Sequence, residues 1–290
     1  ERLRLAGLPT PAWYTSAILS RSPMNWAFAP GQYILKAIGE HASLGLDDSA
    51  VVCVQSATEL VERLALQTAK LDKPCFAEQF IAGREFNLSL LASGKLPQVL
   101  PPAEIDFSAF PADKPHIVGQ AAKWDEGSFE YDHTPRVFDF LSHDGPLLAR
   151  LSSLARSCWQ VLELAGWARV DFRVDEHGQS WILEVNTNCC LSADAGFAAA
   201  VERAGLTLTS AIERIIAAAL KPLTISNLKS QISDFKSASA VTLRTTVTAA
   251  DEAHVREIVA ATGMFRPPEV DVAAELVRIR LRDGAASGYE

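Results

Sequence analysis

Hydrophobic and polar residues alternate with a period of two over residues 167–174 and again over residues 180–186. This pattern predicts two half-buried β-strands. The four residues 176–179 between them fit a hairpin loop. On the first strand we expect one face to carry Val170, Phe172 and Val174 and the other face to carry Arg169, Asp171 and Arg173. On the second strand we expect one face to carry Trp181, Leu183 and Val185 and the other to carry Ile182, Glu184 and Asn186.

In that register Asp171 lies opposite Glu184, and Arg169 lies opposite Asn186. Two carboxylates that face each other across a strand pair repel, and a bound cation removes this repulsion. Carboxylate and amide oxygens are the ligands that Mg²⁺ prefers when it also binds phosphate groups. The spacing leaves two interpretations open: a metal site, or a solvated hairpin face with a different register.

Helical and extended patterns fill most of the remaining chain. Ser56 or Thr58 caps a helix that ends near Leu71, and residues 147–165 carry strong helical periodicity. Residues 101–135 are rich in proline, glycine and acidic residues and are expected to be mostly loop. Other expected strands lie near 13–16, 32–38, 51–55, 75–80, 84–92, 96–100, 116–118, 121–124 and 241–247, and other expected helices near 1–7, 194–204, 207–220, 250–262 and 267–282.

Size and charge narrow the classes of protein. A chain of 290 residues with 48% hydrophobic residues can bury a core and form more than one domain. A net charge of −8 without a basic cluster argues against a nucleic-acid partner, and no apolar run reaches membrane-spanning length. Five cysteines without metal-ligand spacing are typical of free thiols. We therefore expect a cytoplasmic protein with no membrane partner.

Three further segments carry residues that suit a nucleotide. Lys36 ends a strand beside the loop 39–46, whose backbone N–H groups could bind phosphate. Glu78 and Glu85 can accept hydrogen bonds from an amine or from hydroxyl groups. Lys123 follows two alanines in the loop-rich region. Taken singly, each feature is more often a turn or an exposed charge at the end of a strand.

Arg-Val-Asp at 169–171 and Leu-Glu-Val-Asn-Thr-Asn at 183–188, together with these segments in the same order, resemble the ATP-grasp superfamily. The resemblance is to the D-alanine–D-alanine ligase branch and covers about residues 3–220. It implies an α+β ATP-grasp fold, in which two α/β subdomains grip ATP between antiparallel sheets. The implied domains are an ATP-grasp domain (1–220, with a lid-bearing subdomain to about 77 and a metal-binding subdomain from about 78), a linker (221–240) and a partial α/β segment (241–290).

The resemblance also implies roles for individual residues, with ATP and Mg²⁺, or Mn²⁺ in its place, as cofactors. An Arg169 that serves only to pair with Asp171 is the structural alternative. The implied roles are ATP binding for Lys36, Ser43, Glu78, Glu85, Lys123 and Leu183, metal binding for Asp171, Glu184 and Asn186, and stabilisation of the transferred phosphoryl group and the tetrahedral intermediate for Arg169.

The implied activity joins a small-molecule acid to an amine, each an amino acid or peptide, through an acyl-phosphate. Ala42 and Trp124 stand where the family has hydroxyl groups, and Asn188-Cys189-Cys190 replaces its Ser-Pro-Gly. Asp194 falls near a carboxylate-binding serine, and its charge would repel a free carboxylate. We therefore expect a product other than D-alanyl-D-alanine. The competing hypothesis is a non-catalytic ATP-binding module that serves a fused acetyltransferase.

Both ends of the sequence suggest a piece of a longer protein. The chain starts without Met, at about the point where the family's N-terminal domain would join it. Residues 243–251 and 265–269 resemble the opening of a GNAT-type N-acetyltransferase, which implies a fused domain beyond Glu290. The glycine-rich acetyl-CoA loop is not in the sequence, so we do not expect this segment to bind acetyl-CoA alone. A helical cap on the ATP-grasp domain is the alternative.

Overall fold

The structure is a computed structural model. It describes residues 1–21, 28–39, 43, 45–94, 96–219, 247–261 and 267–283. The chain forms two compact units, Glu1–Lys221 and Pro222–Glu290. The predicted linker over 221–240 and all but the last residue of the strand predicted over 241–247 lie outside the described residues, as does Ala42.

The first unit begins with a short helix and a small antiparallel sheet of four strands in the order β1-β4-β2-β3. The helix ends before Gly7, whose φ of +73° suits glycine. Ser56 caps the long helix by accepting a hydrogen bond from the Glu59 N–H. The elements are α1 (Arg2–Leu5), β1 (Trp13–Tyr14), α2 (Ser16–Arg21), β2 (Gly31–Ala37), η1 (Asp48–Ala50), β3 (Val51–Val54), α3 (Ala57–Leu71) and β4 (Cys75–Gln79).

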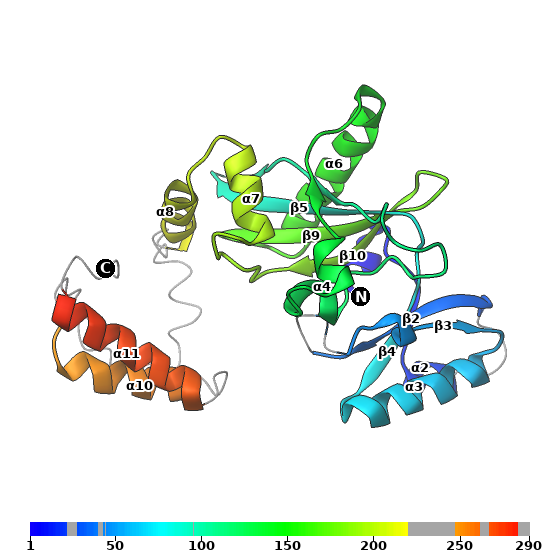
Figure 1. Cartoon of the computed structure of the whole chain (residues 1–290), viewed down its shortest axis with the longest axis horizontal. Coiled ribbons are helices and arrows are strands. Elements are labelled where there is room, and N and C mark those ends of the chain that lie inside the picture. The colour runs from blue at the N-terminus through cyan, green and yellow to red at the C-terminus, as the bar shows by residue number, and fades with distance from the viewer. Residues whose placement is uncertain are drawn as a thin grey trace. The chain divides into compact units, whose positions relative to one another are not determined.

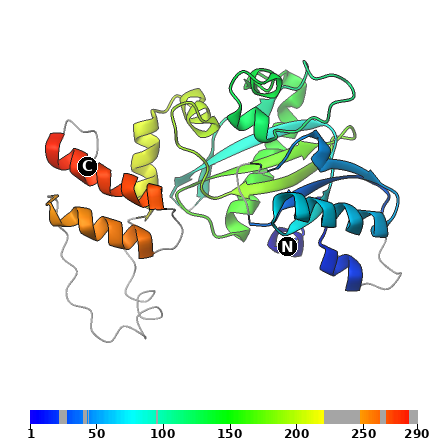
Figure 2. The same cartoon turned by 60° about the horizontal axis from the view of Figure 1, so that its bottom comes forward.

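The two faces of the small sheet differ in character. Leu60 and Leu64 of α3 pack against Tyr33 and Leu35 on one face, and Figure 2 shows α3, in cyan, lying along this side of the sheet. Because side chains alternate along a strand, Lys36 lies on the opposite face. Glu78, which pairs with Ile34 two residues before Lys36, lies on that face too.

The larger sheet follows, with strands in the order β10-β9-β5-β7-β8 and β6 paired to β5. Figure 1 shows it beside the small sheet within the same unit. Its strands are β5 (Arg84–Ser93), β6 (Leu96–Val99), β7 (Ala103–Ile105), β8 (Arg136–Val137), β9 (Trp167–Val174) and β10 (Ser180–Asn186), and its helices are α4 (Gln120–Trp124), α5 (Phe129–Asp132), η2 (Ser142–Asp144), α6 (Gly145–Val161), α7 (Gly196–Arg203) and α8 (Leu208–Ala219).

Helices cover both faces of the larger sheet, and two consecutive leucines of β5 show how. Leu90 packs into a core with Leu151 of α6. Leu91 points to the opposite face and packs with Phe197 of α7 and Ala211 of α8. We call this second face, which also carries the odd-numbered residues of β9 up to 173, the site face.

Two predictions for residues 101–135 are wrong. Residues 121–124 form the helix α4 rather than a strand, and residues 116–118 form no strand. The chain approaches α4 through Gly119, and the Gln120 N–H donates to the Leu46 carbonyl at 2.9 Å. The helix therefore begins at a contact with a distant loop, which local composition does not reveal.

The second unit contains the two predicted helices, α10 (Ala250–Ala261) and α11 (Pro267–Asp283). Arg278 pairs with Glu252 at 2.8 Å, and Arg256 pairs with Asp271. The first contact joins the end of α11 to the start of α10, and the second joins the first half of α11 to the middle of α10, so the helices are antiparallel.

All five cysteines are free thiols. Among the helices that the structure describes, none is both long and apolar enough to cross a bilayer. The cytoplasmic location stays a prediction.

Candidate functional site

The hairpin of β9 and β10 pairs Asp171 with Glu184 and Arg169 with Asn186, as predicted. The route to this register differs from the prediction. Near the turn, Val174 pairs with Ser180, which is one residue out of step with a four-residue loop. A bulge between Ile182 and Glu184 then restores the predicted pairs.

The bulge also changes the faces predicted for β10. Ile182 pairs with Phe172 in the core, whereas Trp181 pairs with Arg173 on the site face. The predicted grouping of Trp181 with Val185, and of Ile182 with Glu184, is therefore wrong, because Leu183 is the extra residue. A local irregularity of this kind is invisible in an alternating pattern.

Asp171 is held from two sides on the site face. Arg169 donates from Nε to Oδ1 at 2.7 Å and from Nη2 to Oδ2 at 2.8 Å. Asn87 of β5 donates to Oδ1 at 2.9 Å. The negative charge of Asp171 raises the pKa of Arg169, despite its partial burial. Asp171 itself is only 8% exposed. Its Oδ1 accepts two of these hydrogen bonds and its Oδ2 accepts one, so Oδ2 keeps a second lone pair for another ligand.

The residues present fit a divalent cation. Asp171, Glu184 and Asn186 present two carboxylates and an amide from one face of the hairpin, and these are hard oxygen donors. No described residue forms a hydrogen bond or ion pair with the exposed Glu184 carboxylate. Within the described ranges no cluster of three or more His, Cys, Asp or Glu side chains could hold a metal. The predicted set is not a cluster of that kind, because it has only two such residues and its third ligand, Asn186, is an amide.

Lys123 of α4 lies within electrostatic reach of this group. Burial lowers the pKa of Lys123, and the positive charge of Arg169 lowers it further. Asp171, Glu184 and Glu85 oppose that shift. The next residue, Trp124, has 62% of its surface exposed. The structure thus brings Lys123 together with Arg169 and the hairpin carboxylates.

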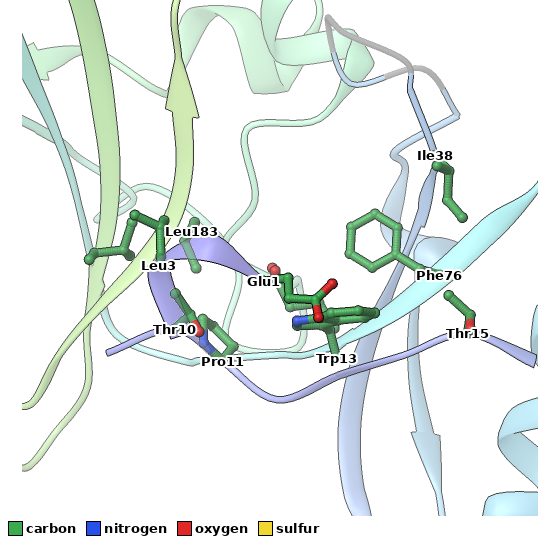
Figure 3. A pocket seen from close by; sticks show the side chains of 11 residues that line it. Glu1, Leu3, Thr10, Pro11, Trp13, Thr15, Ile38, Phe76 and Leu183 are labelled. Carbon is green, nitrogen blue, oxygen red and sulfur yellow. The ribbon is translucent and has the colours of Figure 1, made fainter. Parts of the chain in front are cut away.

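A pocket of about 320 Å³ lies between the small sheet and the edge of the larger one. Figure 3 shows Leu3 and Leu183 on one side of it and Ile38 and Phe76 on the other. Glu78 also lines it. Of the six residues predicted to bind ATP, Glu78 and Leu183 therefore border this pocket, and the other four do not.

Lys36 lies next to the pocket through its partner. Its ammonium group is 2.5 Å from the Glu78 carboxylate, and Lys36 pairs across the sheet with Phe76. The phosphate and nucleoside residues predicted for the small sheet are therefore adjacent.

Glu85 occupies a different environment from the one predicted. Its carboxylate is 2.7 Å from Nη2 of Arg173, and Arg173 also donates to the carbonyls of Gly83, at 3.0 Å, and His116. Burial raises the pKa of Glu85, and the positive charge of Arg173 opposes this. Glu85 thus belongs to a buried ion pair that joins β5, β9 and the loop before α4.

The loop that carries Ser43 touches the start of α4. The Ser43 hydroxyl donates to the Val118 carbonyl at 3.1 Å, and the Gly45 N–H donates to Oε1 of Gln120 at the same distance. A Cβ on Gly119 would overlap the carbonyl oxygen of Leu46. The loop therefore packs against the segment that delivers Lys123.

Sequence reasoning missed three polar residues of the site face. Asn87 binds Asp171, and Arg173 binds Glu85. Arg136 of β8 also belongs to this face, because it pairs with Ile105, which pairs with Glu85. The alternation over 167–174 places Arg173 on the correct face. Nothing in the sequence indicates the partners of Asn87 or Arg136, which come from distant parts of the chain.

Residues 34–217 match the family described as D-ala D-ala ligase C-terminus. The chain is 30% identical over 216 residues to a D-alanine–D-alanine ligase of Laribacter hongkongensis, covering 74% of this chain and 63% of that protein. It is 27% identical over 223 residues to the enzyme of the same name from a Synechococcus species, covering 75% and 61%. The chain thus spans less than two thirds of these relatives.

A solved structure of Bacillus anthracis D-alanine–D-alanine ligase complexed with ATP superimposes with a TM-score of 0.50 and 21% identity, covering 76% of this chain and 62% of that one. The likeness shows the predicted ATP-grasp fold. The expectation of a product other than D-alanyl-D-alanine finds no support here, because both relatives carry the name of that activity. Since the family match covers more than half of the chain, the chain belongs to the D-ala D-ala ligase C-terminus family.

Proposed function

We propose that this chain is the ATP-binding part of a ligase that joins a carboxylate to an amine through an acyl-phosphate. The observation that carries the proposal is the pairing of Asp171 with Glu184, with Arg169 beside them. Two facing carboxylates are stabilised by a divalent cation, and an adjacent arginine suits a reaction that builds negative charge. The family membership supports the same activity.

Each residue has a defined task in this proposal. Mg²⁺ bound by Asp171, Glu184 and Asn186 would neutralise charge on the ATP phosphates. Lys36 and Lys123 bind phosphate oxygens. A substrate carboxylate oxygen attacks the γ-phosphorus and ADP leaves; the amine then attacks the acyl carbon, and phosphate and a proton leave. Further assignments are Glu78 and Leu183 at the adenine, Ser43 over the γ-phosphate, Glu85 near the ribose, and Arg169 at the tetrahedral intermediate.

Glu85 is the assignment that the structure supports least directly, because Arg173 holds its carboxylate. Release from Arg173 or a water-bridged contact would be needed for Glu85 to reach a ribose hydroxyl. Glu78 has a simpler route, since it borders the pocket already.

D-alanine is the first substrate to test, because the relatives named above are D-alanine–D-alanine ligases. The assay measures ADP release from Mg·ATP with D-alanine, and then with pairs drawn from D- and L-amino acids and dipeptides. We expect one pair to release ADP, and Asp171→Ala to abolish that release. Glu176→Gln, a charge change in the exposed hairpin turn, is the control and should keep full activity. Full activity in Asp171→Ala would refute the metal assignment.

ATP binding without ADP release from any pair would favour the competing hypothesis of a non-catalytic nucleotide module. Binding that needs Mg²⁺ and is lost in Asp171→Ala would still support the site itself. Both hypotheses therefore predict Mg²⁺-dependent ATP binding, and only the ligase hypothesis predicts ADP release.

For the second unit we keep the proposal that residues 241–290 begin a GNAT-like domain. The antiparallel pair of α10 and α11 is compatible with it. A glycine-rich acetyl-CoA loop in the full-length protein after Glu290 would support a fused acetyltransferase, and its absence there would count against one.

A further inference from the structure

Arg136 projects from the site face although it lies far along the chain from the hairpin. It pairs with Ile105 of β7, Ile105 pairs with Glu85 of β5, and Glu85 pairs with Arg173 of β9. Directly opposed residues of antiparallel strands point to the same face. Arg136 therefore shares a face with Asp171, two residues before Arg173 in β9.

The guanidinium of Arg136 reaches the segment that follows β10. Nη1 is 3.5 Å from the carbonyl oxygen of Asp194. A Cβ on Gly196 would lie 3.1 Å from Nε and 3.6 Å from Cζ, so the guanidinium rests on the backbone there. Arg136 thus closes the site face on the side of α7, away from the pocket.

Arg136 differs from the other arginines of this sheet. Arg84, Arg169 and Arg173 each pair with a carboxylate at 2.7 Å or less. Arg136 has no carboxylate within 4.0 Å in the part of the chain that the structure describes, and its side chain is exposed. Its one hydrogen bond is the long one to Asp194. Most of its five N–H donors are therefore available to a ligand.

The charges around Arg136 favour an anion. Arg136 is only partly removed from solvent, and this desolvation lowers its pKa. The positive charge of Arg169 lowers the pKa further, while Asp194 acts in the opposite direction. Two guanidinium groups close enough to repel are stabilised by an anion that binds beside them. One of these two groups, Arg169, is the proposed stabiliser of the reacting centre.

We propose that Arg136 is a specificity-determining residue that binds the carboxylate of the amine substrate, and so selects a free amino acid or peptide as acceptor. The planar fork of a guanidinium matches a carboxylate in two parallel hydrogen bonds. This inference deepens the proposed ligase function and rests on it. Arg136 also lies next to Asp194, and its positive charge offsets the repulsion that Asp194 would exert on a substrate carboxylate.

A structural role makes a different prediction. If Arg136 served only to hold the backbone at Asp194 and Gly196, its loss would change stability and would not distinguish acids from amides. The readout must therefore be the preference of the protein for a free carboxylate, measured apart from ATP binding and apart from unfolding.

The test uses calorimetry on the 290-residue chain saturated with Mg²⁺ and a non-hydrolysable ATP analogue. The probes are D-alanine and D-alaninamide, followed by a panel of D- and L-amino acids, each with its own amide. We expect at least one acid to bind more tightly than its amide. Arg136→Met should weaken binding of that acid roughly tenfold to a hundredfold and leave the amide unchanged. Arg136→Lys should keep part of the preference.

Arg156→Met is the matched control, because Arg156 is exposed on α6, on the other side of the sheet. Binding of the nucleotide analogue and urea unfolding should be the same in wild type and both methionine variants. An acid–amide preference that survives in Arg136→Met would overturn the inference, and so would a wild type that binds no acid of the panel more tightly than its amide. If the preference depends on Arg136 but no pair releases ADP, the carboxylate site stands and the ligase function fails.

Discussion

Asp171 and Glu184 lie directly opposite each other on β9 and β10 because a one-residue bulge at Leu183 shifts the register between them. Without the bulge, the pairing that starts at Val174 and Ser180 would place Leu183 opposite Asp171. The same irregularity puts Leu183 on the wall of the pocket. One extra residue therefore aligns the two carboxylates and also supplies an apolar surface for a ligand.

The side chains of Lys36 and Glu78 are 2.5 Å apart, yet substitutions at the two positions should affect phosphate binding and nucleoside binding differently. Lys36→Met should weaken ATP binding by roughly tenfold to a hundredfold, because it removes a charge-assisted hydrogen bond to phosphate. It should weaken adenosine binding little. Glu78→Ala should weaken ATP and adenosine by similar factors. Calorimetric titration of both variants with both ligands measures the two ratios.

Equal losses of ATP and adenosine affinity in Lys36→Met would contradict the assignment of Lys36 to the phosphates. Lys70→Met is a suitable control, because Lys70 forms an exposed ion pair with Asp47 in the same subdomain. It should leave both affinities unchanged.

Gly119 should be required for the contact between the Ser43 loop and the start of α4. An alanine Cβ would overlap the Leu46 carbonyl oxygen, while the φ of −78° suits any residue. Gly119→Ala should therefore force the loop away from α4, with a roughly tenfold loss of ATP affinity. ATP titration by calorimetry is the measurement.

Gly145→Ala provides the matched comparison, since a Cβ there meets no atom within 4 Å and its φ is −47°. ATP affinity should stay at the wild-type value in this variant. The loop contact would have no role in binding if Gly119→Ala behaved in the same way.

Arg173 should stabilise the fold in a pH-dependent manner through Glu85. Burial raises the pKa of Glu85 in the folded state, so the folded state holds this proton at pH values where the unfolded state has lost it, and this contribution to stability declines as pH rises. Arg173→Met removes the compensating charge. It should cost about 3–5 kcal/mol of unfolding free energy at about pH 8, and less at about pH 5.

Urea unfolding at both pH values measures this difference. The double variant Glu85→Met/Arg173→Met should recover most of the loss, because neither charge is then buried alone. A loss that is the same at both pH values would show that Arg173 acts through its hydrogen bonds to Gly83 and His116 rather than through Glu85.

The hairpin shows how far sequence patterns reach in this chain. Period-two alternation locates both strands, and the expected repulsion between Asp171 and Glu184 makes a cation site one of the two interpretations of this face. The pattern could not reveal the bulge at Leu183, because an extra residue in a strand leaves the alternation of residue types on either side of it intact. The predicted pairs Asp171–Glu184 and Arg169–Asn186 are therefore correct, although the predicted four-residue loop is not.

Contacts between residues that are far apart in the sequence are the second feature that sequence patterns do not predict. Arg173 meets Glu85 across 88 positions in the sequence, and the Leu46 contact that accompanies α4 comes from a distant loop. Neither is encoded in the residues around it. The ordered motifs gave the fold because the family resemblance carries tertiary information that local propensity lacks.

In the proposed site, Asp171 and Glu184 bind a metal ion that also binds the ATP phosphates. Calorimetric titration of ATP with and without Mg²⁺, on wild type and on Glu184→Gln, is the decisive experiment, with Glu176→Gln as the control in the same hairpin. We predict that Mg²⁺ strengthens ATP binding in wild type, and that the factor by which it does so is at least about tenfold smaller in Glu184→Gln. Without Mg²⁺ the variant should bind ATP at least as well as wild type, because a negative charge beside the phosphates is gone. Mg²⁺-dependent binding that is unchanged in Glu184→Gln would contradict the claim.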